Sequence, residues 1–445
     1  MKKLFRNRSF SLLFAGALVS SIGTTLFGFA AGLYVQDLFP KEIYDNQGAF
    51  YFSIVAASGI FVRVIFSPIA GAFVDKWNRV RVIYITDFIR GLLFFGTLFI
   101  LSMGLTNYET LYLFIVVTVI AGLNQAFFSP AVGSALPEIV GEDMLQAANG
   151  IQSMVGSIQT IFGVIAGMLL YELVGIEMAI ILNAVSFILS GISEMFIKTK
   201  FVRPSELEED DDFTIVENIK FGFSYLKKKE GLLNMMMFSL MLNLAFSPLF
   251  SIGIPFMFKT ELGKNAYHLG GTDLVFSLSM LIAGPVIGSM VIKKLSSIVR
   301  KGLLFMVGTF VVTSLLIVLQ TYGIIGYWVF YGGFLICMVA FAWAMLLTNV
   351  PLNTGMVKAV DPKVRGRVFG MISSLSAGAI PISMLIAGKI IEYSNVAILS
   401  IVCTLILLIP LYGFLNSKSV KTLIDGFEEA NNGISQKQEE IQQAV

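Results

Sequence analysis

Histidine, cysteine and charged side chains are scarce in this chain of 445 residues, and each scarcity excludes a class of function. His268 is the single histidine, and the two cysteines, Cys337 and Cys403, lie far apart in the sequence. These residues form neither a metal-ligand spacing nor a disulfide framework. The phosphate-binding pattern Gly-x-x-x-x-Gly-Lys-Ser/Thr is absent, which disfavours ATP-driven work by this chain. We therefore expect no metal, no cofactor and no enzymatic activity.

The low charge content also defines the class of protein. Only 13% of the residues are charged and 56% are hydrophobic, with 39 Phe and 20 Met. A soluble domain carries about 25% charged residues, so the composition predicts an all-α membrane protein with many spans. The net charge of +2 is too small to indicate a nucleic-acid partner.

Apolar runs long enough to cross a hydrocarbon core of ~30 Å recur along the whole chain. They predict twelve transmembrane helices in two six-helix bundles. The first run, Ser9 to Val35, is too long for a signal-peptide core and is expected to be retained. The predicted spans are 9–36, 49–74, 81–103, 109–135, 145–171, 176–197, 231–258, 270–292, 301–320, 325–356, 366–391 and 395–416.

Domain boundaries and orientation follow from the polar breaks. The sequence predicts an N-terminal bundle (1–198), a linker (199–230), a C-terminal bundle (231–416) and a tail (417–445). Within the linker, an acidic run is followed by a stretch typical of an interfacial amphipathic helix. Pro68, Gly71 and Val74 recur in the second half with the same spacing, as Pro285, Gly288 and Val291, which indicates diverged repeats. Most Lys and Arg fall in the termini and on one set of loops, so both termini are predicted to be cytoplasmic, in a plasma membrane.

One charged stretch between the second and third predicted spans has a specific pattern. Gly71, Asp75, Lys76, Arg79 and Arg81 lie in a tight turn between two long apolar runs. The stretch resembles the Gly-x-x-x-Asp-Arg/Lys-x-x-Arg-Arg/Lys loop of the major facilitator superfamily, with the last basic residue, Arg81, displaced by one position. An ordinary turn with basic residues on the cytoplasmic side is the alternative. The resemblance implies that Asp75 meets the N-terminus of span 11 and latches the two bundles on the cytoplasmic side, which suits a carboxylate because a helix N-terminus carries a partial positive charge.

A second motif opens span 11. Arg365, Gly366 and Arg367 belong to a segment, Asp361-Pro-Lys-Val-Arg-Gly-Arg-Val-Phe, that resembles the signature of the macrolide-efflux and multidrug proton-antiporter branch of the superfamily. Phe-Phe-Ser-Pro-Ala at 127–131 and Ala-Ala-Asn-Gly at 147–150 resemble the same branch. The Arg that many drug antiporters carry in span 4 has no counterpart at 121–125, and span 5 lacks the proline of many exporters.

Ionisable residues inside predicted spans are candidates for ion coupling, because each is costly in hydrocarbon. Arg63 lies about 18 Å from the charged turn, near mid-membrane, and can act as a cavity charge or as half of a structural ion pair. Asp87 and Arg90 are three residues apart on one helix face, only about 9 and 13 Å inward from Arg81, and are expected to pair. Glu194 is expected to reach water near the cytoplasmic end of span 6, and Asp37 is expected to be solvated at the outer end of span 1.

Uncharged polar residues within the spans either line a substrate cavity or form hydrogen bonds between helices. The abundance of Phe and Met is compatible with a soft cavity for varied amphipathic molecules. The cavity candidates are Gln36, Asn124, Gln125, Gln152, Gln159, Asn243, Asn349 and Asn353, with Asn183 as a further polar position.

These observations and the resemblance imply a secondary active transporter that exports small amphipathic compounds by proton-coupled alternating access. Its partners would be a small-molecule substrate, protons and membrane lipid, and the chain is expected to be a monomer. Transport of a lipid-like or peptide metabolite is the alternative within transport. A substrate-sensing receptor would usually carry a larger soluble output domain, and a membrane-embedded enzyme would need a convergent acid, base or metal cluster that the sequence lacks.

Overall fold

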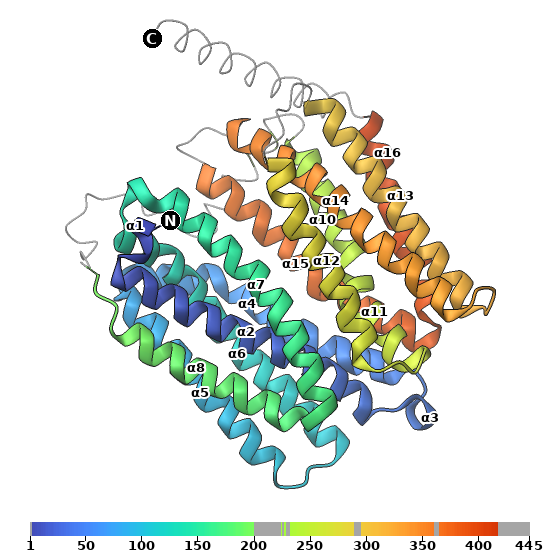
Figure 1. Cartoon of the computed structure of the whole chain (residues 1–445), viewed down its shortest axis with the longest axis horizontal. Helices are drawn as coiled ribbons and strands as arrows, with labels where there is room; N and C mark the ends of the chain where they lie inside the picture. Colours follow the sequence, from blue (N-terminus) through green and yellow to red (C-terminus); the bar gives the residue numbers. More distant parts are fainter. Residues whose placement is uncertain are drawn as a thin grey trace, which may run out of the picture. The chain divides into compact units, whose positions relative to one another are not determined.

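The computed structural model describes residues 2–199, 224, 227, 232–288, 295–359 and 365–416. Within these ranges the chain is helical with short connections, and no strand occurs (Figure 1). The predicted linker lies almost wholly outside the described residues, and the predicted tail lies entirely outside them.

The helices follow the predicted spans closely. The first half of the chain forms α1 (Lys2–Phe5), α2 (Arg8–Leu38), α3 (Lys41–Tyr44), α4 (Gln47–Lys76), α5 (Arg79–Leu101), α6 (Asn107–Val140), α7 (Glu142–Val174) and α8 (Ile176–Met195). The second half forms α10 (Leu232–Pro248), the π-helix η2 (Leu249–Gly253), α11 (Ile254–Phe256), the π-helix η3 (Met257–Glu261), α12 (Ala266–Gly288), α13 (Leu295–Thr321), α14 (Tyr327–Ala359), α15 (Arg365–Tyr393) and α16 (Val396–Asn416).

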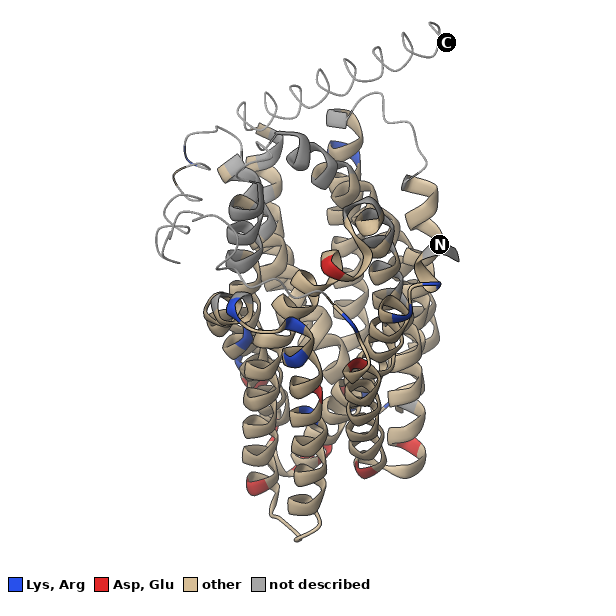
Figure 2. Cartoon of the chain, turned by 90° about the vertical axis from the view of Figure 1, so that its left-hand side faces the viewer, with Lys and Arg blue, Asp and Glu red and all other residues tan. Residues whose placement is uncertain are grey.

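Ten helical stretches within the described residues are long and apolar enough to cross a membrane. The two remaining predicted spans correspond to α7 and α15, which are long helices, but only Ile161–Val174 of α7 forms a shorter apolar segment. The all-α membrane class is therefore confirmed, whereas the count of twelve stays a prediction at these two helices. Figure 2 shows that charged residues interrupt the helical surface only sparsely.

Local sequence explains where several helices begin. Asn7 caps α2 by accepting from the Phe10 N–H, and Asn78 caps α5 by accepting from the Arg81 N–H. Thr106 opens α6 with a complete capping box, in which the Glu109 side chain accepts from the Thr106 N–H. Such caps satisfy backbone N–H groups that lack a partner within the helix. Because α4 ends at Lys76 and α5 begins at Arg79, the predicted tight turn between them is confirmed.

The chain divides into two compact units whose bounds do not coincide with the halves of the sequence. The first unit holds the described residues of Met1–Asp212, Phe250–Leu274 and Met384–Asn395. The second unit holds those of Phe213–Leu249, Val275–Ser383 and Val396–Val445. In the second unit, α13 packs against α14 and α16, and Phe246 of α10 makes edge-to-face contacts with Phe310 and Phe341. The predicted domain bounds stay predictions.

Within the first unit, two segments from late in the sequence pack on the ends of early helices. The Lys259 ammonium in η3 lies 3.1 Å from the Asp37 carboxylate at the end of α2, and the Tyr171 hydroxyl donates to the same carboxylate. The Asn46 amide donates to the Ser394 carbonyl at 3.0 Å, just after α15. We call Asp37, Tyr171 and Lys259 the outer cluster, because the sequence predicts that this end faces away from the cytoplasm.

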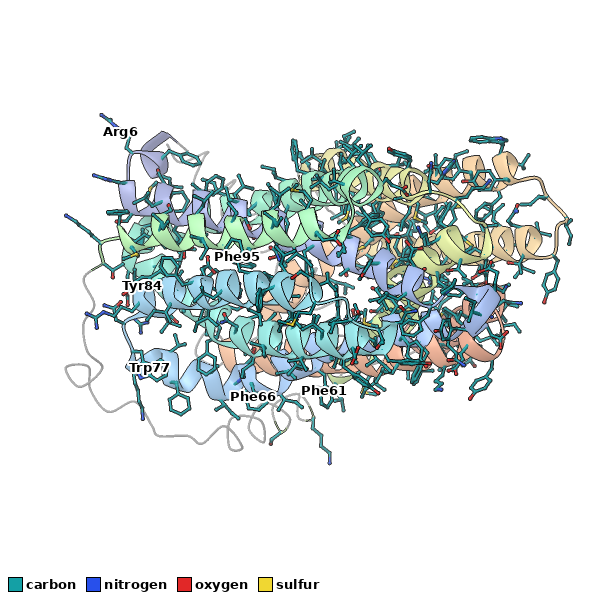
Figure 3. The ribbon with its side chains drawn as sticks, turned by 90° about the horizontal axis from the view of Figure 1, so that it is seen from below. Arg6, Phe61, Phe66, Trp77, Tyr84 and Phe95 are labelled. Carbon is teal, nitrogen blue, oxygen red and sulfur yellow. The ribbon has the colours of Figure 1, made fainter. Side chains whose placement is uncertain are left out.

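The interior of the first unit has an apolar layer at each end. One layer centres on Phe27, Phe94, Phe114, Ile180 and Phe187, and the other centres on Leu13, Val74, Ile83, Val132 and Ile139. In contrast, the surface carries many apolar side chains, such as Phe61 and Phe66, which project from α4 (Figure 3). An apolar surface of this extent is typical of helices that face lipid.

Candidate functional site

A group of polar side chains lies between the two apolar layers of the first unit. On α5, Asp87 and Arg90 fall between Ile83 of one layer and Phe94 of the other. On α8, Glu194 lies between Phe187 of one layer and Ile197 of the other, which follows the end of the helix. Because α5 and α8 pack side by side, the three charged groups meet in the protein interior. We call Asp87, Arg90 and Glu194 the inner cluster.

The inner cluster is fully enclosed. The exposed fractions are 0% for Asp87, 5% for Arg90 and 0% for Glu194. An Arg90 guanidinium nitrogen, Nη1, lies 3.7 Å from Asp87 Oδ1, and the Glu194 carboxyl lies beside the Asp87 carboxyl. The predicted pairing of Asp87 with Arg90 is confirmed. The expectation that Glu194 reaches water is wrong, because α2 and α5 pack over this face of α8 and bury it.

Neutral neighbours hold the guanidinium in place. Arg90 Nε donates to the Asn124 side-chain oxygen of α6 at 3.0 Å. Its guanidinium carbon also lies 4.6 Å from the ring centre of Phe128 and 5.2 Å from that of Phe187, within cation–π range. The cation is thus fixed by one hydrogen bond and two aromatic faces.

The carboxyl groups have fewer partners. Ser190 lies one turn before Glu194 on α8, and its hydroxyl donates to Glu194 Oε1 at 3.2 Å. The Asp87 carboxyl lies within hydrogen-bonding reach of Ser190 and of the Glu194 carboxyl. Neither Asp87 oxygen, nor Glu194 Oε2, nor Arg90 Nη2 has a well-aligned hydrogen bond among the described residues. Two buried carboxyl groups that share one hydroxyl donor and one guanidinium are costly to keep ionised together, so the inner cluster is a candidate functional site for binding a proton.

Close packing between α2 and α8 depends on small residues. A Cβ atom at Gly16 of α2 would lie 2.8 Å from Ser190 Oγ and 3.1 Å from Glu194 Oε1. Larger side chains at Gly16 would therefore push into the inner cluster. Small residues at this kind of helix contact let two membrane helices approach closely.

The structure places the other charged candidates apart from the inner cluster. Asp37 is exposed, as expected, and belongs to the outer cluster. Arg63 is exposed at the middle of α4, and no described carboxylate lies within ion-pair distance of it.

The predicted latch stays a prediction. Arg79 pairs with Glu138 of α6, whereas Lys76 and Arg81 are exposed. The side chains of Asp75, Arg365 and Arg367 lie outside the described part of the chain, as does the environment of Gly366, while Gly71 lies within α4 with open space beside it.

The polar cavity candidates divide into several groups. Gln36 is buried and Asn124 holds Arg90, whereas the Gln159 amide donates to the Thr25 hydroxyl at 2.8 Å between α7 and α2. Gln125 donates to Ser129 on its own helix. Gln152 is exposed, Asn243 and Asn349 are half-buried in the second unit, and the Asn353 side chain lies outside the described residues. For Gln159 and Asn124, a contact between helices is therefore established.

Sequence reasoning missed one acidic residue. Asp273 lies within α12, inside the predicted span 270–292, and no ion pair is formed by it among the described residues. The sequence alone could have identified Asp273, because an acidic residue inside an apolar span is as unusual there as at Asp87. It is a further candidate for a functional carboxylate.

Long apolar helices around a buried charged cluster define a multi-pass helical membrane protein. Residues 13–384 match the family model of the Major Facilitator Superfamily. The chain therefore belongs to this superfamily and is a transporter of that type.

Relatives and solved structures agree with this assignment. The chain is 28% identical over 380 residues to the MFS-type transporter YkuC of Bacillus subtilis (strain 168), covering 83% of this chain and 82% of YkuC. It is 20% identical over 386 residues to macrolide efflux protein A of Streptococcus pyogenes, covering 85% and 88%.

Among solved structures, a bacterial homologue of the iron transporter ferroportin in an inward-facing state has a TM-score of 0.67 at 16% identity, covering 93% of this chain and 100% of that one. A D-xylose-proton symporter has a TM-score of 0.65 at 12% identity, covering 88% and 97%. At these identities, the structures support the fold alone.

Proposed function

We propose that this protein exports small amphipathic compounds in exchange for protons, and that the inner cluster carries the coupling proton. The observation that carries the proposal is the enclosure of two carboxyl groups with a single guanidinium in the interior of the first unit. A distant likeness to macrolide efflux proteins supports amphipathic compounds as the substrate class.

The charge balance of the inner cluster supports proton binding. Asp87 and Glu194 would together carry two negative charges if both were ionised, against one positive charge on Arg90. An unbalanced charge is costly away from water, and two carboxylates that share a site resist joint ionisation. One bound proton makes the inner cluster neutral. Opening the α5–α8 contact to water would allow this proton to leave.

Alternating access requires helix ends to separate and rejoin on each side of the membrane. In the first unit, the outer cluster and the Asn46–Ser394 hydrogen bond tie early helices to segments from late in the sequence. Opening on this side would break these contacts. The predicted latch at Asp75 would act in the same way on the opposite side.

Arg63 is proposed to contact the substrate. An Arg at mid-membrane that faced hydrocarbon would be costly, by several kcal/mol on lenient scales. Its exposure at the middle of α4 without an ion-pair partner among the described residues favours a face that lines a polar passage. An Arg at this depth would attract the polar or anionic part of an amphipathic compound.

The proposal is tested by transport into inverted membrane vesicles with an imposed proton gradient, acid inside. Radiolabelled erythromycin and ethidium serve as probes. Wild-type vesicles should accumulate a probe, Asp87→Asn and Glu194→Gln should abolish gradient-driven accumulation, and Asp37→Asn should retain it. Equal accumulation by wild type and Asp87→Asn/Glu194→Gln would contradict proton coupling through the inner cluster.

The substrate class is tested separately by drug susceptibility of cells with and without the chain. Expression should raise the tolerated concentration of macrolides or cationic dyes. No change for any amphipathic drug, together with accumulation of a labelled lipid or peptide in the vesicles, would favour the alternative of a lipid-like or peptide metabolite.

A further inference from the structure

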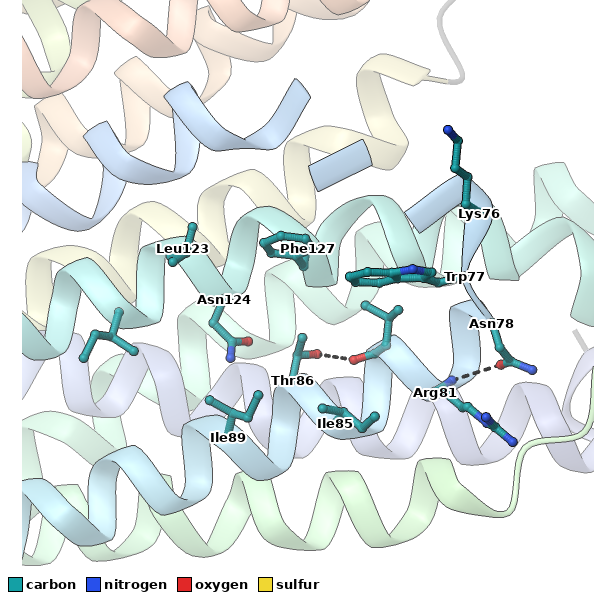
Figure 4. A pocket seen from close by; sticks show the side chains of 12 residues that line it. Lys76, Trp77, Asn78, Arg81, Ile85, Thr86, Ile89, Leu123, Asn124 and Phe127 are labelled. Atoms are coloured by element: carbon teal, nitrogen blue, oxygen red, sulfur yellow. Dashed lines mark hydrogen bonds between the residues drawn. The ribbon is translucent and has the colours of Figure 1, made fainter. Parts of the chain in front are cut away.

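A groove with a volume of about 790 Å³ lies on the first unit, between the end of α4 and the neighbouring faces of α5 and α6 (Figure 4). Its walls are apolar side chains, among them Ile85 and Ile89 of α5 and Leu123 of α6. Thr86 and Asn124 contribute the polar part of its floor.

The groove borders an exposed apolar surface of α5 and α6. Ile85 and Ile89 are 46% and 45% exposed, and the apolar face of α5 continues beyond the groove to Leu92, which is 67% exposed. On α6, the face continues to Val116, which is 53% exposed. The rise from Arg81 to Leu92 is about 16 Å, which matches one leaflet of a hydrocarbon core of ~30 Å.

One end of the groove is basic. Lys76 and Arg81 flank it there from opposite sides (Figure 4), beside Asn78, and both basic side chains are exposed. The groove lining contains no acidic residue among the described side chains. Glu138 of α6 pairs with Arg79, which is not part of the lining. Positive charge at the membrane surface with an apolar channel beneath it complements an anionic headgroup with its acyl chain.

We propose that this groove binds an anionic phospholipid, with its headgroup at the end that Lys76 and Arg81 flank and an acyl chain along Ile85, Ile89 and Leu123. The lipid would lie in the leaflet on the side of the α4–α5 turn, where basic loops are expected to face a negatively charged surface. Binding at this site is independent of what the protein transports.

The groove also reaches the inner cluster through a single residue. Asn124 lines the groove and accepts the hydrogen bond from Arg90 Nε at 3.0 Å. If the proposed proton coupling holds, a lipid in the groove would stabilise the α5–α6 arrangement that keeps Arg90 in place. This consequence rests on the proposed function, whereas lipid binding itself does not.

The chain contains its own reporter for this site. Trp77 lines the groove, is 49% exposed and stacks on Phe127, and the chain has only three tryptophans. The variant Trp328→Phe/Trp343→Phe keeps Trp77 alone. Purified protein is reconstituted in phosphatidylcholine vesicles that contain brominated phosphatidylglycerol or, separately, brominated phosphatidylcholine, and quenching of Trp77 is measured against the fraction of brominated lipid.

Brominated phosphatidylglycerol should quench Trp77 at lower fractions than brominated phosphatidylcholine does. Two basic contacts of about 1 kcal/mol each would raise the relative association constant by about thirtyfold at most, and by less at higher salt. Lys76→Gln/Arg81→Gln should remove this preference. The matched control Arg6→Gln/Arg8→Gln removes the same number of positive charges from exposed positions before and at the start of α2. This control should retain the preference for the anionic lipid. A variant with Trp328 alone, which is 74% exposed, should show no preference.

Three outcomes would overturn the proposal. Equal quenching by the two brominated lipids, or a preference that survives in Lys76→Gln/Arg81→Gln, would show that the basic end does not select an anionic headgroup. Displacement of the quenching lipid by a transported macrolide would instead assign the groove to the substrate. The lipid assay needs no transport, so failure of the proposed function would leave its result intact.

Discussion

The two charged clusters of the first unit use the same residue types in opposite surroundings. In the inner cluster, Asp87 and Glu194 are fully buried beside Arg90, and several of their polar atoms have no well-aligned hydrogen bond among the described residues. In the outer cluster, the Asp37 side chain is 46% exposed and the Lys259 side chain is 20% exposed, with a separation of 3.1 Å. The tighter ion pair is therefore the more solvated one.

This difference separates two roles for charge in a membrane protein. Exposed ion pairs contribute little to stability, so breaking one costs little free energy. This suits a contact that forms and opens in each transport cycle. A buried pair is poor evidence for stability, but removal of one partner leaves a charge uncompensated. The inner cluster should therefore be the sensitive region, and the outer cluster the tolerant one.

The largest expected effect is at Arg90. Arg90→Met leaves the buried carboxyl groups without their cation and should destabilise the protein by about 3–5 kcal/mol. Thermal unfolding of the purified protein in detergent measures this, with Arg63→Met as the matched control, because Arg63 is also in a membrane helix but is exposed. Similar losses for the two variants would contradict the distinction between buried and exposed cations.

A smaller effect is expected from packing around the inner cluster. Gly16→Ala places a methyl group 2.8 Å from Ser190 Oγ and should cost about 1–3 kcal/mol through overpacking. On the same helix, Gly28→Ala meets nothing within 4 Å and should be close to neutral. Comparison of the two unfolding temperatures isolates the contact, and equal temperatures would show that α2 and α8 are less closely packed than described.

The smallest expected effect is in the outer cluster. A double-mutant cycle with Asp37→Asn and Lys259→Gln should give a coupling energy of about 0–1 kcal/mol for this half-exposed pair. The coupling should fall further at high salt, because exposed charges are screened. A coupling above about 3 kcal/mol that does not respond to salt would place the pair in a buried environment instead.

The fold was largely predictable from the sequence because membrane helices require long apolar runs. The α4–α5 turn and the Asp87–Arg90 pair were also predictable, since both depend on local spacing along one chain segment. Burial of Glu194 was not, because it results from how α8 packs on α2 and α5, which a single helix does not encode. Asp273 was overlooked although it lies inside a predicted span, where any acidic residue is a candidate.

The central claim, that Asp87 and Glu194 hold the coupling proton, is tested most directly by proton release on substrate binding. Purified protein in a weakly buffered solution with a pH-sensitive dye is mixed with saturating substrate. Because antiport requires substrate and proton to weaken each other's binding, the wild-type protein should release protons, up to about one per chain. Asp87→Asn/Glu194→Gln should bind substrate without release. Undiminished release by that variant would contradict the claim and direct the search to Asp273.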